Sequence, residues 1–226
     1  MLWTQRRAVP PHCRYGDPLV STFLGPLIVV RHGETEWSRL GRHTGRTDLG
    51  LTDLGREQAG RAAGVIVEVL DGRTVGLVFS SPRQRALATA DLALSAFGIT
   101  PVIDDRLAEF DYGAYEGLLT DEILARDPSW KLWRDGCPGG ESPADVASRC
   151  DAFLRDLDAE AARMTLTDDR AAVVVCHGHL SRALVSRAVG WSVDTAEGLD
   201  NGTASVALVE GHKGRRVLRA WNRQRA

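Results

Sequence analysis

The chain lacks the cysteine pairs and the long apolar runs that would assign it to an extracellular or membrane class. Its 226 residues include four cysteines, which lie far apart without CxxC spacing. Because no secretory segment accompanies them, we expect free thiols in a reducing cytoplasm rather than a disulfide framework. No stretch reaches the ~18 consecutive apolar residues of a membrane span. We therefore expect a soluble protein that does not bind membranes.

Excess charge of one sign is also missing. The sequence has 28 Lys and Arg residues against 30 Asp and Glu residues, for a net charge of -2. Such a balance gives no strong field for nucleic acid, so we expect no nucleic-acid partner and only local roles for basic residues. We interpret the arginines near the C-terminus as part of a solvated edge and tail. They are Arg215, Arg216, Arg219, Arg223 and Arg225.

The length and the apolar content are sufficient for one well-buried core. Hydrophobic residues make up 43% of the chain, and no internal repeat interrupts it. Residues 1–26 combine several prolines and arginines without a continuous apolar run. We therefore predict a disordered leader over residues 1–26 and a single domain over residues 27–226.

Apolar runs alternate with helical patterns along this domain. Strands are predicted at 27–30, 75–79, near 102, 171–176, 203–209 and 217–221, and helices at 51–70, 81–97, 121–126, 142–157 and 180–189. Alternating strands and helices predict an α/β fold with right-handed crossovers. We expect a three-layer α/β/α sandwich whose central sheet is mostly parallel, with an antiparallel edge strand.

The start of the predicted helix at 81–97 has a marked sequence signal. Ser81 is predicted as its N-cap, Pro82 as its first residue and Gln84 as the capping-box residue. Residues two apart in a helix point to nearly opposite sides. We therefore assign Arg83 to a pocket and Arg85 to solvent.

Two of the predicted strands end in a histidine followed by glycine. Arg31, His32 and Gly33 follow the first strand, and His177, Gly178 and His179 follow the strand at 171–176. Ligands of α/β sheets collect beyond the carboxyl ends of strands. His32 is therefore the first candidate for a nucleophile.

Four separated motifs, one of which contains His32, occur along the chain in a recognisable order. They are Arg-His-Gly-Glu-Thr at 31–35, Ser-Ser-Pro-Arg at 80–83, Leu-Ala-Glu-Phe-Asp-Tyr-Gly at 107–113 and His-Gly-His at 177–179. In this order they resemble the histidine phosphatase superfamily, also called phosphoglycerate mutase-like, from Leu27 to the C-terminus. Segments 41–48 and 133–142 are also similar to its branch of broad-specificity acid phosphatases and sugar-bisphosphatase-like members.

The resemblance implies a metal-independent phosphatase with no cofactor. His32 would attack phosphorus, a phosphohistidine would form, and water would release phosphate. Arg31, Arg83 and His177 would surround the phosphoryl oxygens, and these cations would keep His32 unprotonated. Glu109 would supply the proton of the leaving group.

Glu109 must be protonated for this role. Partial burial and a bound phosphate dianion would both raise its pKa, which predicts a better rate at mildly acidic than at alkaline pH. Asp111 and Glu116 lie nearby in the sequence and compete for the role. The motif position favours Glu109.

A second group of residues is predicted to contact substrate through backbone N–H groups and hydroxyls, although each fits ordinary turn chemistry equally well. The substrate implied is a small phosphorylated metabolite such as a sugar phosphate, and a phosphoprotein or a phosphoglycerate derivative stays open. The predicted substrate-binding residues are Gly33, Glu34, Thr35, Ser38, Thr44, Gly45, Tyr112, Gly178 and His179.

Three other functions compete with the phosphatase. Cofactor-dependent phosphoglycerate mutases of the family typically have Arg after the acidic residue, whereas Phe110 and Asp111 follow Glu109 here. A zinc hydrolase could use His43 with the two later histidines, but no HExxH or Asp-rich pattern completes such a site. A catalytically inactive sugar-phosphate binding protein is disfavoured because the main catalytic positions are filled. The oligomeric state stays open, with a homodimer as one alternative.

Overall fold

The computed structural model describes residues 25–167 and 169–225. The predicted leader lies outside this range except for its last two residues, Gly25 and Pro26, which are buried. The Pro26 carbonyl accepts a hydrogen bond from the Ala172 N–H at 2.8 Å. The described chain therefore enters the sheet at this point.

A six-stranded sheet forms the centre of the molecule, in the order β3-β2-β4-β1-β5-β6. The first four strands in this order are mutually parallel, whereas β5 runs antiparallel to β1 and β6 antiparallel to β5. The prediction of a mostly parallel sheet with antiparallel pairing at one edge is confirmed. The strands are β1 Leu27–Arg31, β2 Thr74–Ser80, β3 Val102–Ile103, β4 Arg170–Cys176, β5 Val206–His212 and β6 Arg215–Arg223.

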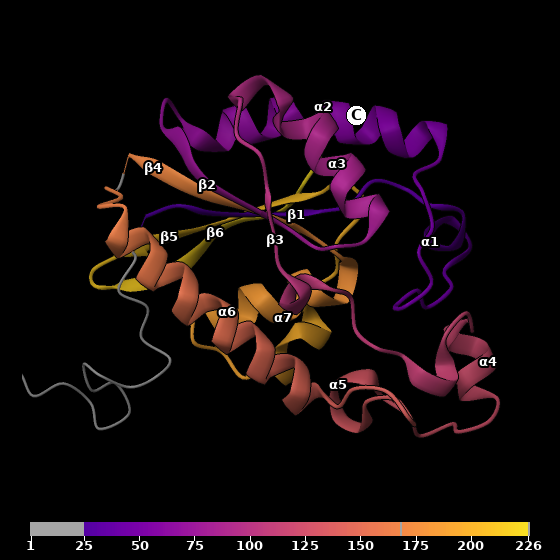
Figure 1. Ribbon diagram of the computed structural model, residues 1–226. Coiled ribbons are helices and arrows are strands. Elements are labelled where there is room, and N and C mark those ends of the chain that lie inside the picture. The colour runs from indigo at the N-terminus through magenta and orange to yellow at the C-terminus, as the bar shows by residue number, and fades with distance from the viewer. Residues whose placement is uncertain (1–24, 168, 226) are drawn as a thin grey trace, which may run out of the picture.

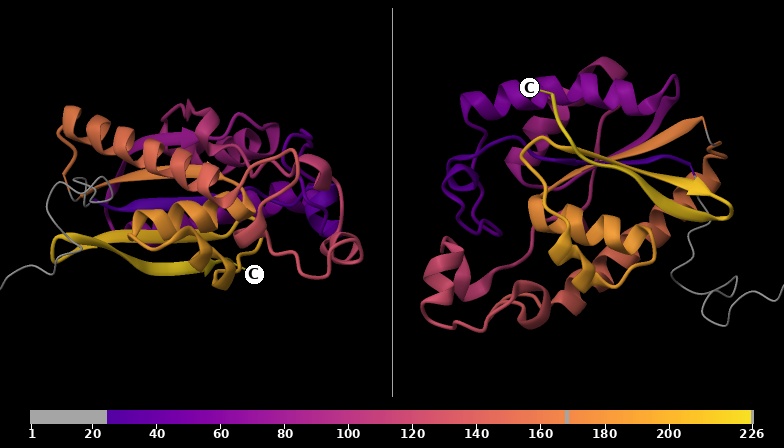
Figure 2. Two further views of the ribbon diagram at one scale, coloured as in Figure 1. Left: turned by 90° about the horizontal axis from the view of Figure 1, so that it is seen from below. Right: turned by 180° about the vertical axis from the view of Figure 1, so that it is seen from behind.

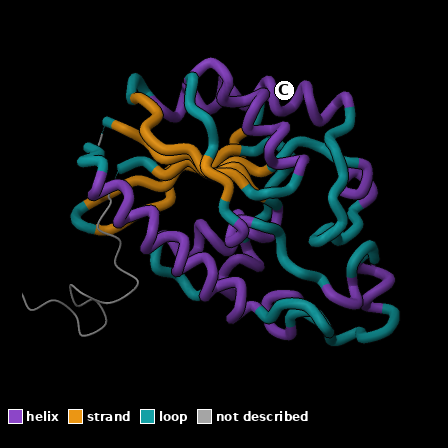
Figure 3. Tube along the Cα trace, viewed as in Figure 1, coloured by secondary structure: helices purple, strands orange, loops and turns teal. Residues whose placement is uncertain are grey.

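Helices cover both faces of the sheet, which confirms the three-layer sandwich. α2 (Asp53–Leu70) and α3 (Gln84–Leu94) lie on one face, and α6 (Pro143–Arg163) and α7 (Gly178–Ala188) on the other (Figures 1 and 2). The strands accordingly form the middle layer of Figure 3. The short helices are α1 Glu36–Leu40, α4 Thr120–Leu124 and α5 Leu132–Asp135, and the 3-10 turns are η1 Ser95–Phe97, η2 Asp105–Leu107, η3 Gly113–Tyr115 and η4 Val193–Gly198.

The two halves of the core follow from the period of two in the strands. In β1, Leu27 and Val29 belong to the core under α6 and α7, whereas Ile28 and Val30 belong to the core under α2 and α3. β4 lies between β2 and β1, and its apolar residues are buried on both faces. A central parallel strand must be apolar on both faces, which explains the continuous apolar run in its sequence.

The long helix α6 begins as its sequence predicts. The Ser142 side chain accepts a hydrogen bond from the Asp145 N–H, the Asp145 side chain accepts one from the Ser142 N–H, and Pro143 is the first residue. Apolar residues at helical spacing form its inward face, and all of them are buried: Val146, Cys150, Phe153, Leu154 and Leu157.

The predicted start of α3 is wrong. The helix begins at Gln84, and Ser81 does not cap it, because the Ser81 hydroxyl lies 2.7 Å from His177 Nε2. The Gln84 N–H instead donates to the Asp48 carboxylate at 3.0 Å. Arg83 occupies the N-cap position with an extended backbone and therefore lies outside the helix.

The prediction for the C-terminal arginines is wrong at Arg216. This residue is buried and pairs with Asp158 of α6 at 3.0 Å, whereas the other four arginines are exposed. Alternation along β6 explains the difference, because Arg216 faces the side opposite to Arg215. Among the described residues, no helix combines the length and the apolar character that crossing a membrane requires.

Candidate active site

The carboxyl ends of three neighbouring strands place the first site residues together. Arg31 of β1 is opposite Cys176 of β4, and Ser80 of β2 is opposite Val175. The residues that follow these ends are His32, Ser81 and His177. The His32 N–H donates to the Cys176 carbonyl at 2.9 Å, and the Ser81 N–H donates to the Val175 carbonyl at 3.0 Å. The sheet itself therefore brings together residues from distant parts of the sequence.

His32 presents a neutral imidazole with one free nitrogen. Its Nδ1 lies 2.6 Å from the Gly33 carbonyl, which can only accept, so Nδ1 carries the hydrogen and Nε2 keeps its lone pair. Burial, followed by the charges of Arg85 and Arg31, lowers the pKa of His32 well below its usual value. The ring is therefore unprotonated at neutral pH, as the predicted nucleophile must be.

A short relay fixes the backbone beside this histidine. The Gly33 N–H donates to Thr89 Oγ1 at 3.0 Å, and the Thr89 hydroxyl donates to the Arg85 carbonyl at 2.7 Å. A Cβ on Gly33 would lie 2.2 Å from the Gly55 carbonyl oxygen, so only glycine fits this turn. Thr89 is a positioning residue that the sequence reasoning missed.

Arg85 is fully buried, so the prediction that it faces solvent is wrong. Its Nε donates to His177 Nδ1 at 3.2 Å, and its Nη1 and Nη2 donate to the carbonyls of Thr47 and Thr44 at 3.0 Å each. The nearest carboxylate is that of Asp48, at 3.9 Å. Carbonyl dipoles thus surround most of this guanidinium, and burial lowers its pKa. A buried cation with so little compensation favours an anionic ligand.

The late start of α3 explains why Arg85 was wrongly assigned to solvent. Arg83 is not in the helix, so the rule that residues two apart diverge does not apply. The buried face of α3 consists of Arg85, Ala86, Thr89, Ala90, Ala93 and Leu94. A signal was available in the sequence, because Arg85 shares its helix face with a stripe of small residues. Arg83 is half-buried, and its Nε is buried without a hydrogen-bond partner in the described chain.

His177 is a second neutral imidazole of fixed tautomer. Arg85 Nε can only donate, so His177 Nδ1 accepts, and Nε2–H donates to Ser81 Oγ at 2.7 Å. Burial and then the charge of Arg85 lower the pKa of His177 well below its usual value. The rings of His177 and His32 meet edge to face, with centroids 5.2 Å apart.

Arg31 supplies a second cation to the site. Its Nη1 donates to the Asn201 carbonyl at 2.5 Å, and a Cβ on Gly178 would lie 3.2 Å from its Cζ. Burial lowers the pKa of Arg31, whereas the Glu109 charge opposes this shift. Gly178 therefore gives the guanidinium room to lie against the first turn of α7.

The Glu109 carboxylate lies at the N-terminus of α7. Its Oε2 accepts from the His179 N–H at 3.0 Å, and its Oε1 accepts from the N–H groups of Leu180 and Phe110 at 2.9 and 2.8 Å. Because the α7 N-cap residue His177 makes no side-chain capping bond, Glu109 satisfies the orphan amides of this helix instead.

The two competing carboxylates serve other partners. Glu116 accepts hydrogen bonds from the N–H groups of Gly45 and Thr47, and Asp111 pairs with Arg46 at 2.7 Å. Neither residue lines the pocket that Glu109 lines. The structure therefore favours Glu109 among the three.

A pocket of about 210 Å³ lies above these groups. Of the predicted site residues, it is lined by Arg31, His32, Ser38, Thr44, Glu109, Tyr112, Gly178 and His179. The others do not line it: Gly33, Glu34, Thr35, Gly45, Arg83 and His177, although His177 contacts the site through the edge of His32. Lining residues that were not assigned to a substrate site are Gly41, Arg42, His43, Thr120, Arg182, Asp200 and Asn201.

Several of the predicted substrate-binding residues make hydrogen bonds that order the loop after β1. Thr35 and Ser38 form the capping box of α1, and Thr35 N–H donates to Ser38 Oγ at 2.8 Å. Glu34 accepts a hydrogen bond from the Thr52 hydroxyl at 2.8 Å, which connects the loop to the start of α2. These residues shape the pocket wall through the backbone.

His179 belongs to an aromatic cluster on the far side of Gly178. The Tyr112 hydroxyl lies 2.5 Å from His179 Nδ1, and His43 stacks on His179 with a centroid distance of 6.0 Å. Burial raises the pKa of Tyr112 and lowers that of His179, so the phenol donates to a neutral imidazole. Within the described residues, no three His, Cys, Asp or Glu side chains are grouped to hold a metal ion.

Comparison with known proteins confirms the family resemblance. Residues 27–224 match the model of the histidine phosphatase superfamily (branch 1). An acid phosphatase of Mycobacterium tuberculosis is 42% identical over 85% of this chain and 89% of its own length. A glucosyl-3-phosphoglycerate phosphatase of Mycolicibacterium vanbaalenii is 39% identical over 82% and 84%, and the sedoheptulose 1,7-bisphosphatase of Saccharomyces cerevisiae is 38% identical over 69% and 64%.

Solved structures agree with this assignment. The open reading frame Rv3214 from Mycobacterium tuberculosis superposes with a TM-score of 0.77 at 39% identity, covering 88% of this chain and 98% of that one. The mycobacterial glucosyl-3-phosphoglycerate phosphatase Rv2419c, solved in a complex with VO3, superposes with a TM-score of 0.74 at 35% identity, with the same coverage.

The electrostatic role of Arg85 can be tested directly. Replacing Arg85 with Gln removes the larger of the two charges that depress the pKa of His32, so this pKa rises. It stays below the usual value because burial and Arg31 remain. NMR titration of the His32 ring measures the shift, with Arg83→Gln as the matched control. An equal rise in both variants, or none in Arg85→Gln, would contradict this account.

Proposed function

As a member of the histidine phosphatase superfamily the chain is a phosphatase, and we propose that it hydrolyses small phosphorylated metabolites through a phosphohistidine on His32. One observation carries the proposal: the free Nε2 of a neutral His32 lies beside buried guanidinium groups. An attacking imidazole must have a lone pair, and a transferring phosphoryl group must have cations around its oxygens.

The chemistry divides into two transfers. In the first, the Nε2 lone pair forms a bond to phosphorus while the bond from phosphorus to the ester oxygen breaks. In the second, water attacks phosphorus, inorganic phosphate leaves, and the electron pair returns to His32 Nε2. The Nδ1–H stays bonded to the Gly33 carbonyl throughout, which keeps the ring oriented.

Arg31, Arg85 and His177 are the proposed donors to the phosphoryl oxygens. Arg85 takes the role that the sequence assigned to Arg83, because Arg85 contacts His177 and acts on His32. His177 Nε2–H, which donates to Ser81 in the free enzyme, is directed by Arg85 on the opposite nitrogen. Arg83 adds positive potential from the N-cap of α3.

Glu109 is the proposed general acid. Its Oε1 accepts two backbone N–H groups, whereas Oε2 accepts only one, from His179. Oε2 therefore has a position left to carry the proton that the departing alkoxide takes. After hydrolysis begins, the resulting carboxylate can accept a proton from the attacking water.

Phosphatase chemistry is favoured over a mutase. The relatives described above are named as phosphatases. Phe110 and Asp111 follow Glu109, and Phe110 is buried, so neither position supplies a cation to the pocket. A screen of phosphomonoesters that includes 3-phosphoglycerate with its bisphosphate primer separates the two functions. Phosphate release is expected, and isomer formation with little release would overturn the proposal.

A cytoplasmic location and a homodimer are further proposals. Cys137, Cys150 and Cys176 are buried free thiols, as expected in a reducing compartment. Exposed Val102 and Ile103 occupy the β3 edge of the sheet, which offers an apolar surface to a second copy. Sedimentation of the wild type should show a dimer that Ile103→Lys weakens, and a wild-type monomer would exclude it.

The contributions of Arg83 and Arg85 to catalysis can be distinguished by measuring the activity of single variants. In Arg85→Leu, kcat should fall about 100-fold or more, because one buried donor to the transition state is lost. In Arg83→Leu, the loss should be much smaller, because the hydrogen bond to His177 comes from Arg85 and Arg83 is not among the charges that lower the pKa of His32. Steady-state kinetics on one aryl phosphate compare them, and the reverse order would restore the assignment to Arg83.

The acid role of Glu109 predicts a dependence on the leaving group. In Glu109→Gln, kcat/KM for an alkyl phosphate should fall about 100-fold or more, because an alkoxide needs a proton. For p-nitrophenyl phosphate the loss should be far smaller, because nitrophenolate leaves unprotonated. Circular dichroism controls for damage to the α7 cap. Equal losses on both substrates would argue for a purely structural role.

A further inference from the structure

We propose that Arg182, assisted by Arg42, binds a second acidic group of the substrate in the pocket that His32 also lines. The preferred substrates are then phosphomonoesters that also carry a carboxylate or another phosphate. This inference rests on the phosphatase function proposed above. It concerns residues that the phosphoryl transfer itself does not use.

Arg182 is held in place as a preorganised cation. It lies on α7, one turn after His179, and its guanidinium packs over the Trp133 ring with Cζ 5.4 Å from the centroid. Its Nε donates to the Ala196 carbonyl at 2.8 Å and its Nη2 to the Glu197 carbonyl at 3.0 Å. Both acceptors belong to η4, so helix, ring and turn fix one orientation.

The remaining nitrogen of the guanidinium, Nη1, is the one proposed to bind the anion. Within the described chain, Arg182 Nη1 has no hydrogen-bond partner, and the side chain lines the pocket. None of the carboxylates in the described segments lies within ion-pair distance of Arg182, and burial lowers its pKa. A partly desolvated guanidinium with a free donor gains more from an anion than from a neutral hydroxyl.

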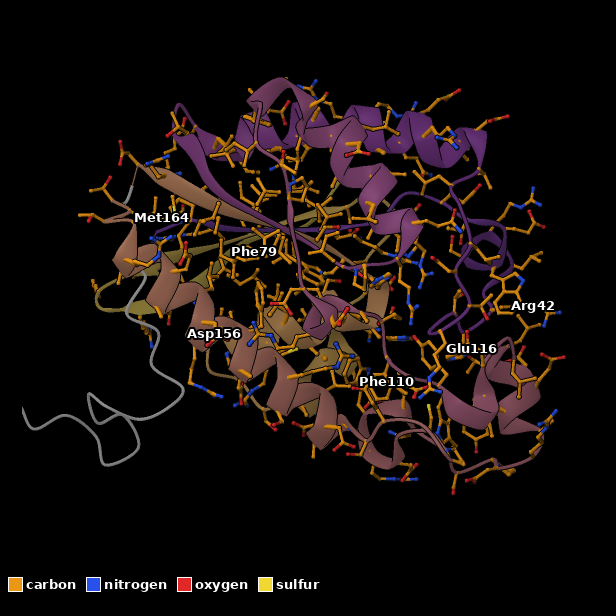
Figure 4. All side chains as sticks on the ribbon, in the orientation of Figure 1. Arg42, Phe79, Phe110, Glu116, Asp156 and Met164 are labelled. Atoms are coloured by element: carbon orange, nitrogen blue, oxygen red, sulfur yellow. The ribbon has the colours of Figure 1, made fainter. Side chains whose placement is uncertain are left out.

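Arg42 faces the pocket from a different segment. It follows α1 and lies beside the segment that leads into α4 (Figure 4). Its Nη1 donates to the Gly117 carbonyl at 2.6 Å and lies 3.7 Å from the Glu122 carboxylate. Half-burial and this distant partner leave the cation accessible from the pocket.

These two arginines line the same pocket as Arg31 and His32 but come from different segments. Arg42 follows α1, and Arg182 lies in the second turn of α7. A phosphate at His32 is already served by Arg31 and the buried Arg85. Arg42 and Arg182 are therefore available to a different anionic group of the same molecule.

Asp200 opposes the binding of an anion to Arg182. It also lines the pocket, and its charge favours the cationic form of Arg182. The same negative charge repels an anionic group of the substrate. Replacing Asp200 with Asn should therefore lower the KM for doubly acidic substrates.

The test compares substrates that differ in their second group. The substrates are p-nitrophenyl phosphate, with no second acid, 3-phosphoglycerate, with a carboxylate, and fructose 1,6-bisphosphate, with a second phosphate. Arg182→Leu should lower kcat/KM about 10- to 100-fold for an acidic substrate, mainly through KM, because a charged hydrogen bond is lost. The loss on p-nitrophenyl phosphate should be less than about threefold. The acidic substrate with the larger loss identifies the second group.

Two further variants serve as controls for Arg182→Leu. Arg182→Lys should recover part of the loss, and the exposed Arg126→Leu should change neither substrate class. An equal loss on all three substrates in Arg182→Leu, or a loss confined to kcat, would overturn the second anion site. If wild-type enzyme released phosphate from none of them, the phosphatase proposal itself would fail, and so would this inference.

Discussion

The hydrogen bond from buried Arg85 to His177 is the interaction on which the rest of the site depends. Arg85 places a positive charge where water is excluded, and the carbonyls of Thr44 and Thr47 fix its direction. Through this contact it sets the tautomer of His177, and its charge adds to the effect of burial in lowering the pKa of His32. A single guanidinium thus acts on both imidazoles of the proposed phosphoryl site.

Such a centre is costly in the free protein, because a buried cation loses hydration and here gains mainly the dipoles of two carbonyls and of His177, with the nearest carboxylate 3.9 Å away. The fold offsets this cost with the relay through Thr89 and Gly33 and with the sheet that holds His32 and Ser81 in register. Glu109 also has two roles, since it accepts hydrogen bonds from the first amides of α7 and lines the pocket. The hydrogen bonds that stabilise the fold around Arg85 and Glu109 are therefore the same ones that position the proposed catalytic groups.

Much of this could be predicted from the sequence, because local patterns decide it. The alternation of apolar runs with helical patterns indicated the layers and the mostly parallel sheet. The strand-end histidines and Glu109 were also found, since their motifs are local. Arg85 was missed because tertiary contacts overrode a local capping signal: Ser81 bonds to His177, and Asp48 caps α3 from another segment. Arg182 was missed because its sequence has no unusual feature, and only the fold brings it to the pocket.

The covalent intermediate on His32 is the central claim, and a rapid-quench experiment tests it most directly. Enzyme is mixed with a 32P-labelled phosphomonoester, quenched in alkali within milliseconds, and digested for mass spectrometry. The account predicts phosphate on the peptide that contains His32, stable in alkali and lost in acid, as a phosphoramidate requires. Label on another residue, or turnover with no labelled protein at any time point, including in variants with slowed hydrolysis, would contradict it.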